Sequence, residues 1–270
     1  MSTNPTQPTQ LDHVIILLPY ADLKSPPNWI TSNFSLSPGG RHSDSKTENR
    51  LVIFQDGTYL ELIAFINDDP AKRKGHWWDK PNGIVDFACT TSGDFAYEDL
   101  QQRLRDSGSG ISYAAPQEGG RRMPDGQELE WKVTFPLGAE RGEVPFWCHD
   151  VTPRERRVPV HNGKTEHPCG AVGMAGITIK IDSAKHGKIS KSMAAITETS
   201  PDSSSRFAVG APIAKAGSAG DWVHVAELDP AEGVASMLEL TLRTPGHDKQ
   251  KPFRQDVGDG SVCISFDNSE

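Results

Sequence analysis

The chain has 270 residues, with 28 Lys and Arg against 36 Asp and Glu, which gives a net charge of −8. This length allows a sizeable hydrophobic core in one or two domains without disulfide or metal support. The acidic balance argues against nucleic acid or an anionic membrane as the main partner, because both are recognised through clustered Lys and Arg. No aliphatic run approaches the ~20 residues of a membrane helix. Because the first ten residues contain neither a basic residue nor an apolar stretch, we expect a cytoplasmic protein.

The four cysteines, Cys89, Cys148, Cys169 and Cys263, lie far apart, and no C-x-x-C pair occurs. This spacing excludes zinc-ribbon and thioredoxin-like sites. We therefore expect reduced thiols that are mostly buried.

Residues 11–65 predict a strand, a helix and three further strands. Leu11 to Leu18 is rich in Val, Ile and Leu, as is typical of a buried strand. Pro26-Pro27 opens a short helix, because proline at the first helical turn loses no hydrogen bond. Further along, the tight turn at Asp56-Gly57 introduces the last strand, TYLELIAF.

The same order recurs in residues 84–151. Gly39-Gly40-Arg41 is repeated 80 residues later as Gly119-Gly120-Arg121, and each copy precedes a polar loop and a strand. Between the strand at 84–90 and the second copy, Tyr97, Leu100 and Leu104 share one helical face that ends at Gly108. The chain is therefore predicted to contain tandem βαβββ units.

A third and fainter unit follows, with a strand at AGITIKI, helical spacing in Ile189, Met193 and Ile196, and strands at 221–228 and 237–244. Its low apolar content predicts that it packs on the first two units. We divide the chain into a disordered tail, a paired βαβββ domain, a connection, the third unit and a mobile C-terminal tail: 1–10, 11–151, 152–172, 173–245 and 246–270.

Four blocks in order, LDHVIILLP, GGRH, TENRLVIF and GTYLELIAF, together with the repeat, resemble the glyoxalase-like domain family of the vicinal oxygen chelate superfamily. The resemblance covers residues 11 to about 180 and extends more loosely to about 245. It implies an α+β fold in which tandem βαβββ units form curved mixed sheets around a cleft, with the helices outside.

The resemblance also implies a metal site, since first and fourth strands carry the ligands in that superfamily. His13 and Glu61 match the ligand positions of the first unit, and imidazole and carboxylate suit a divalent ion such as Zn, Ni, Mn or Fe(II). The second unit departs from the pattern. Aligning Asp86-Phe87 with Asp12-His13 replaces one ligand by Phe87, and either Cys148 or His149 lies opposite Glu61.

Each candidate residue also has a structural interpretation. His13 is otherwise a core histidine, and Glu61 an outward-facing charge on a half-exposed strand. His42 and His149 are candidate proton carriers, with Glu61 as a third catalytic group. Arg41 is a candidate clamp for a substrate anion, and the run Arg154 to Arg157 is most simply a solvated connection. Further candidates for the cleft lining and substrate binding are Thr47, Asn49, Trp77, Trp78 and Trp147.

The resemblance and these residues together favour a metal-assisted enzyme that acts on a small oxygenated metabolite by isomerase, lyase or ring-opening chemistry. The alternative is a non-catalytic protein that sequesters a small molecule, as bleomycin-binding relatives do. The incomplete second ligand set favours the alternative, whereas the His13 and Glu61 pair favours the enzyme. The expected partner is a small molecule, with neither nucleic acid nor membrane, and a homodimer is left open.

Overall fold

The computed structural model describes residues 9–268, apart from 124, 162, 214–219, 233, 235 and 247–249. The strands are β1 (Gln10–Leu17), β2 (Ser37–His42), β3 (Thr47–Ile53), β4 (Tyr59–Phe65), β5 (Gly83–Thr90), β6 (Ser112–Tyr113), β7 (Gln117–Arg122), β8 (Glu128–Thr134), β9 (Pro136–Leu137), β10 (Phe146–Asp150), β11 (Gly173–Ile181), β12 (Arg206–Val209), β13 (Asp221–Glu227), β14 (Ser236–Arg243), β15 (Phe253–Val257) and β16 (Gly260–Asp267). The helices are α1 (Tyr20–Lys24), α2 (Asn28–Thr31), α3 (Pro70–Arg73), α4 (Tyr97–Ser107), α5 (Arg154–Arg157) and α6 (Ser183–Thr197), with short 3₁₀ turns η1 (Ile66–Asp68) and η2 (Pro230–Glu232).

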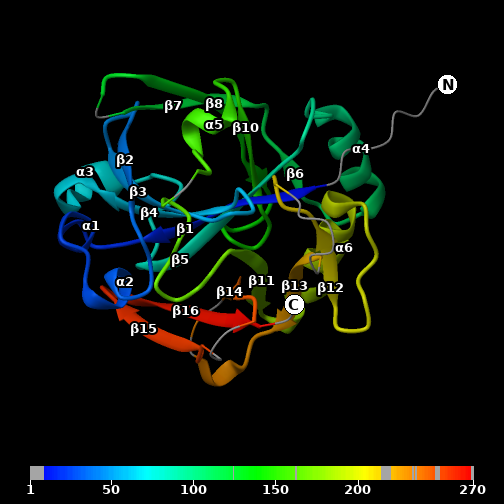
Figure 1. Ribbon diagram of the computed structural model, residues 1–270. Coiled ribbons are helices and arrows are strands. Elements are labelled where there is room, and N and C mark those ends of the chain that lie inside the picture. Colours follow the sequence, from blue (N-terminus) through cyan, green and yellow to red (C-terminus); the bar gives the residue numbers. More distant parts are fainter. Residues whose placement is uncertain are drawn as a thin grey trace.

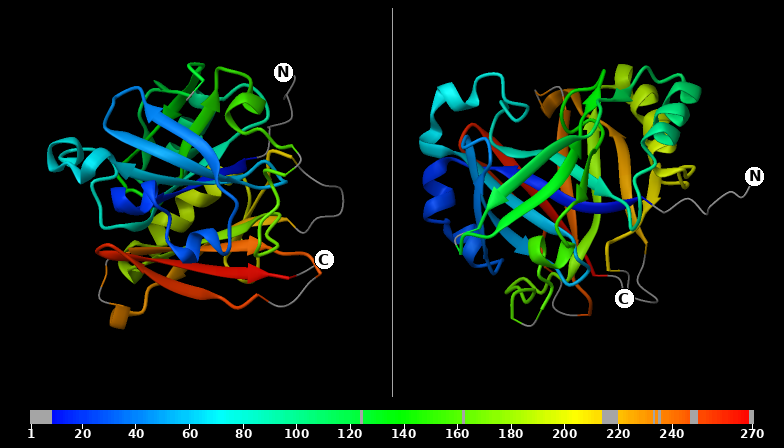
Figure 2. Two further views of the ribbon diagram at one scale, coloured as in Figure 1. Left: turned by 60° about the vertical axis from the view of Figure 1, so that its left-hand side comes forward. Right: turned by 90° about the horizontal axis from the view of Figure 1, so that it is seen from above.

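The first two units form a closed ring of strands in the order β1-β4-β3-β2-β7-β8-β10-β5, which closes where β5 pairs with β1 (Figure 1). Each unit contributes four strands, and its first and fourth strands pair in parallel. The helices lie outside the ring, with α1, α2 and α3 on one side and α4 beside α6 on the other (Figures 1 and 2). The predicted α+β fold of tandem βαβββ units is confirmed.

The two Gly-Gly-Arg segments meet where the units join. They lie on β2 and β7, which pair antiparallel at Arg41 with Arg122 and at His42 with Arg121. A Cβ atom on Gly40 would lie 2.4 Å from the carbonyl oxygen of Arg122. Glycine is therefore required for β2 to approach β7 and close the ring at this side.

The C-terminal region contains two incomplete copies of the unit. Strand β11 pairs antiparallel with β14 through a bulge, as β1 does with β5. Helix α6 and strands β12 and β13 follow β11, with β13 parallel to it. Strand β16 is parallel to β14, and β15 forms a hairpin with β16. This pairing repeats the arrangement of first, third and fourth strands in the complete units.

The prediction of a mobile tail over 246–270 is therefore wrong for residues 253–267. The run SVCISFD alternates apolar and polar residues, and Val262 and Ile264 are buried while Ser265 is exposed. At the other end of the chain, β1 begins at Gln10, within the predicted N-terminal tail, and residues 1–8 lie outside the described part.

The ring and the C-terminal strands share one hydrophobic core. Strand β16 pairs with β5 at Ser261 and Gly83, and helices α4 and α6 contact each other. A single cluster of buried side chains extends from Leu11 to Ile264. Leu238, Leu240 and Leu242 of β14 point into this core, as strand alternation predicts. Among the described helices, none has the length and apolarity needed to cross a membrane.

The position of β16 leads to a stability prediction. Ile264→Ala removes a side chain that is 1 % exposed and should lower the free energy of unfolding by about 2–4 kcal/mol. Ser265→Ala, on the exposed face of the same strand, should change it by less than about 0.5 kcal/mol. Urea denaturation measures both, and a neutral Ile264→Ala would contradict the packing of β16 against the core.

Candidate functional site

The interior of the ring contains a cavity of about 150 Å³ to which both units contribute. Its histidines come from the first unit and the segment that follows it, whereas the second unit supplies Gln117, Glu118 and Arg121 together with apolar and aromatic side chains. The lining includes His13, His42, Thr47, Asn49, Tyr59, Glu61, His76, Trp77, Trp78, Arg121, Trp131, Val133, Phe135, Phe146, Cys148 and Arg157.

A β-bulge presents both Asp12 and His13 to the interior. The register of β1 against β5 shifts between Leu11 and His13, which leaves Asp12 as the extra residue. Asp12 and His13 are both buried, at 0 % and 3 % exposure. Nδ1 of His13 donates a hydrogen bond to the Asp12 carboxylate over 2.7 Å. This contact fixes the ring and leaves the Nε2 lone pair facing the cavity.

Glu61 is buried at the centre of the polar lining. Its Oε1 accepts a hydrogen bond of 2.6 Å from Nδ2 of Asn49 and lies 3.2 Å from Nε2 of His42. Its Oε2 lies 3.5 Å from Nε2 of His13. Burial raises the pKa of the Glu61 carboxyl. The hydrogen bond from His42, the positive charges of His42 and His13 in their protonated forms, and the hydrogen bond from Asn49 lower this pKa to about 2. Glu61 is therefore ionised at neutral pH.

The contacts of His42 define how its ring is protonated. Because Glu61 is an anion, Nε2 of His42 carries the proton that points to it. Nδ1 then accepts from the Thr47 hydroxyl, 2.7 Å away. His42 is 14 % exposed and lines both the cavity and a larger groove outside it, so it is the imidazole nearest to solvent in this site.

His13 and Glu61 present two acceptors to each other. When the His13 ring is neutral with its proton on Nδ1, the Nε2 lone pair faces the anionic Oε2 across 3.5 Å, and both side chains are buried. Two unshared acceptors at this separation are unfavourable in a low-dielectric interior unless a cation or a proton lies between them.

A cluster of four charged residues forms the wall behind His13. Arg157 is 3 % exposed and contacts Asp12, Asp150 and the Tyr59 hydroxyl. Arg154 lies 2.5 Å from Asp12. Burial raises the pKa of Asp12, but the two guanidinium groups hold it well below its usual range. The interpretation of residues 154–157 as a solvated connection is therefore wrong for Arg154 and Arg157, which α5 brings against the ring, whereas Glu155 and Arg156 are exposed.

Aromatic side chains form the remaining wall of the cavity. Trp77 is 40 % exposed at the rim, and its ring lies 4.8 Å from that of Phe135. Trp78 is buried and donates from Nε1 to Asp86 over 3.1 Å. Phe146 packs edge-on against His13 at 5.4 Å. The expected aromatic lining by Trp77 and Trp78 matches this geometry.

The strand register identifies the counterpart of His13 in the second unit. Val14 pairs with Phe87, and on either side of it His13 and Ile15 pair with Ala88 and Asp86. A local two-fold axis relates the two units and exchanges Val14 with Phe87. It therefore places Asp86, one residue before Phe87, at the position equivalent to His13, one residue before Val14. The bulged residue is Asp12 on one strand and Val85 on the other, so the alignment of Asp86-Phe87 with Asp12-His13 is wrong by one residue.

The counterpart of Glu61 follows from the same register. Glu61 pairs with Ile15, and Phe146 pairs with Ala88, the counterpart of Ile15. Phe146 therefore takes the place of Glu61, and neither Cys148 nor His149 corresponds to it. Asp86 is already engaged by Trp78, and burial raises the pKa of its carboxyl. The second unit thus provides no matching histidine and glutamate.

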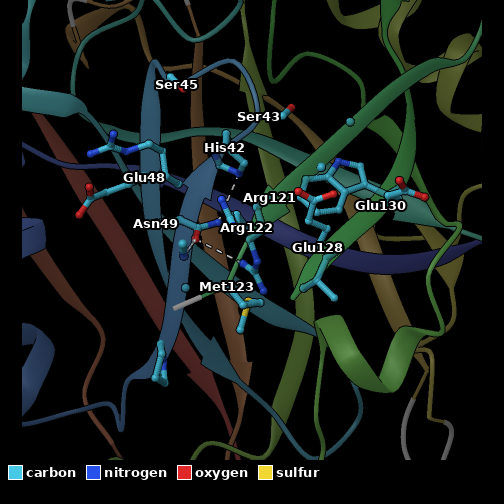
Figure 3. Close-up of a pocket in the computed structure, with 18 of the residues that line it drawn as sticks. His42, Ser43, Ser45, Glu48, Asn49, Arg121, Arg122, Met123, Glu128 and Glu130 are labelled. Carbon is cyan, nitrogen blue, oxygen red and sulfur yellow. Dashed lines mark hydrogen bonds between the residues drawn. The ribbon is translucent and has the colours of Figure 1, made fainter. Parts of the chain in front are cut away.

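Arg41 does not enter the cavity. It is exposed and lines the outer groove of about 1500 Å³, which runs along β2, β3, β7 and β8 and shares Asn49 and Arg121 with the cavity. Figure 3 shows His42 and Arg121 reaching Asn49 at this point. Of the two Gly-Gly-Arg arginines, Arg121 is the one that lines the cavity. The repeat was the available signal for Arg121, whereas nothing in the sequence marked Arg157 or Tyr59.

Trp147 and His149 also lie outside the cavity. Cys148 lines it, and because side chains alternate along β10, its two neighbours face the opposite side. The His149 ring stacks on Phe95 at 4.3 Å and lies 5.8 Å from Trp147. Burial lowers the pKa of His149 to about 4. The predicted catalytic role of His149 and substrate contact of Trp147 are therefore not supported by their positions.

Two further groups complete the description of the site. Ligand atoms of Asp12, His13 and Cys148 lie within 4.8 Å of one another, but burial raises the pKa of the Cys148 thiol and Asp12 is held by two arginines. His167 is not among the described residues that line the cavity. It accepts from the backbone N–H of Ser35 and donates to the carbonyl of Ile53, which indicates a structural role.

The environment of His149 predicts a pH effect on stability. A depressed pKa means that the unfolded chain takes up the proton first, so stability is lost as the pH falls from 6.5 towards 4. His149→Phe keeps the aromatic stack and removes this loss. Relative to wild type, it should gain about 2 kcal/mol in free energy of unfolding near about pH 5 and much less at neutral pH. Denaturation series at several pH values measure this, and an equal difference at all pH values would contradict it.

Comparisons with known proteins agree with this architecture. The sequence profile of the glyoxalase-like domain matches residues 11–192. A hypothetical protein from Staphylococcus aureus is similar in structure, with a TM-score of 0.65 and 13% identity, over 96% of this chain and 99% of that chain. A mutant of 4-hydroxymandelate synthase from Streptomyces coelicolor is similar with a TM-score of 0.50 and 12% identity, over 90% and 72%. No curated protein sequence matches the chain.

The structural likeness extends across nearly the whole chain, so the incomplete C-terminal units have counterparts in the Staphylococcus aureus protein. The matched profile covers both complete βαβββ units, including the strands that carry His13 and Glu61. The chain belongs to the glyoxalase-like domain family.

Proposed function

We propose that the protein is an enzyme that acts on a small oxygenated metabolite with the help of a divalent metal ion held by His13 and Glu61. The observation that carries this proposal is the pair of acceptors described above. The Nε2 lone pair of a neutral His13 and the anionic Oε2 of Glu61 face each other across 3.5 Å in the lining of the cavity.

The donor set fits a divalent ion. Two ligand atoms that each lie ~2.1 Å from one ion are about 3–3.5 Å apart, which is the separation found here. Asp12 holds His13 through Nδ1, in the manner of the carboxylates that orient metal-binding histidines. Imidazole with carboxylate is compatible with Zn, Ni, Mn or Fe(II) and does not select among them.

When bound, such an ion polarises a carbonyl or hydroxyl oxygen of the substrate. The protein's own residues supply the rest. Nε2–H of His42 points into the cavity and lies next to a permanent anion, so His42 is placed to give up and take back a proton. Asn49 fixes the orientation of the Glu61 carboxylate. The aromatic wall limits access of water. Isomerase, lyase and ring-opening reactions all need proton transfer beside a polarised oxygen.

A metal-free protein that sequesters a small molecule is the second candidate. The observation that favours it is the second unit, where Asp86 and Phe146 stand at the counterparts of His13 and Glu61. Phe146 has no donor atom, and Asp86 is bonded to Trp78. Under this interpretation, His13 is protonated and forms an ion pair with the carboxylate of Glu61.

Metal analysis distinguishes the two candidates. Purified wild-type protein should contain stoichiometric divalent metal by mass spectrometry, and His13→Ala and Glu61→Gln should contain little. After removal of the metal with EDTA, calorimetric titration with Zn, Ni, Mn and Fe(II) should show tight binding of at least one of them. Asp12→Asn should weaken that binding roughly tenfold to hundredfold, because it loses the carboxylate that orients His13.

His149→Phe is the matched control, since it replaces a histidine of the same sheet that faces away from the cavity. Its metal content should equal that of wild type. Metal binding that survives His13→Ala would contradict a site at His13 and Glu61. Wild-type protein that binds none of the four ions would leave the metal-free candidate.

A further inference from the structure

Arg121 is a buried cation without a direct counter-ion. Its side chain is 4 % exposed on β7 and lines the cavity. Within the described part of the chain, no carboxylate oxygen lies within 4.0 Å of its nitrogens. Its two polar contacts are long, from Nη1 to Oδ1 of Asn49 at 3.3 Å and from Nη2 to the carbonyl of Arg157 at 3.4 Å. Its Nε atom is buried with no partner among those residues.

The other buried arginine of the cavity is different. Arg157 contacts both Asp12 and Asp150, so its charge is balanced within the protein. Glu61 is the nearest buried anion to Arg121 along the hydrogen-bond chain, but the amide of Asn49 lies between them. Burying a guanidinium is costly unless an anion accepts its forked hydrogen bonds. Arg121 therefore has guanidinium N–H groups that can donate to an anionic ligand in the cavity.

The shape of the guanidinium defines the anion. Its planar fork matches the two oxygens of a carboxylate, which accept two parallel hydrogen bonds.

The size and walls of the cavity define the rest of the ligand. A volume of about 150 Å³ is that of a cavity that accommodates a benzene-sized ring. Trp77, Trp131 and Phe135 line it together with Phe146, and aromatic faces and edges pack well against a planar ring. We infer that the cavity binds a small aryl monocarboxylate, with its carboxylate on Arg121 and its ring against these side chains.

This inference names the substrate class of the site and rests on the proposed function for the claim that the ligand is turned over. Binding itself is independent of the metal. The test therefore uses the full chain after treatment with EDTA and follows tryptophan fluorescence, since Trp77, Trp78 and Trp131 line the cavity. The probes are benzoate, benzamide as an uncharged ligand of the same shape, acetate as a charge without a ring, and inorganic phosphate.

Benzoate should bind to wild-type protein, and benzamide and acetate should each bind at least roughly tenfold more weakly. Phosphate should not displace benzoate. Arg121→Met should weaken benzoate binding roughly tenfold to hundredfold and remove the preference over benzamide. Arg41→Met is the matched control, because Arg41 holds the corresponding place in the first repeat but is exposed. It should leave benzoate binding within about twofold of wild type.

Equal binding of benzoate and benzamide to wild type, or unchanged benzoate binding by Arg121→Met, would overturn the inference. Displacement of benzoate by phosphate at similar concentration would overturn the aryl class, since an inorganic anion would then suffice. If Arg121→Met does not fold, Arg121→Lys keeps the charge and loses the fork, and its benzoate affinity should fall as well. His13→Ala should lose metal and still bind benzoate, which separates failure of this inference from failure of the metal site.

Discussion

The buried carboxylate of Asp12 is the constraint on which the rest of the site depends. It stands at a bulge in the first strand, where it is fully buried and cannot be hydrated. Its charge is stabilised because α5 brings Arg154 and Arg157 against it. Breaking such a buried pair from one side leaves an uncompensated charge and costs about 3–5 kcal/mol. The connection between the second and third units is thus held in place by the same group that orients His13.

The two complete units have the same backbone fold, but their side chains at equivalent positions serve different purposes. Across the local two-fold, His13 is replaced by Asp86 and Glu61 by Phe146. The first unit carries His13, His42 and Glu61, whereas the second supplies Arg121 and the aromatic side chains of β8 and β10. A cavity with identical halves would offer a ligand two equivalent orientations. The divided roles favour one orientation of the inferred ligand, with its carboxylate at Arg121 on β7 and its ring towards β8 and β10.

Much of the fold followed from patterns that act over short distances. Strand alternation, the Gly-Gly-Arg repeat and the Asp56-Gly57 turn are local signals, and they located both complete units. The meeting of His13 and Glu61 followed from the family resemblance. Features that depend on distant contacts were missed. The burial of Arg157 depends on Asp12, which lies 145 residues away, and β16 is fixed by pairing with β14 and β5. Whether Trp147 and His149 point into the cavity or away from it depends on the register of β10, which the sequence alone does not determine.

The joint between β2 and β7 differs in strength from the other joint between the units. Two residue pairs join β2 to β7, whereas seven join β1 to β5. Within the ring, only the pairing of β5 with β10 is equally short. His42 and Arg121 are themselves one of the two pairs at the β2–β7 joint. A ligand that engages Arg121 therefore contacts a residue of the sparser of the two joints between the units, and sparse pairing is where local opening costs least.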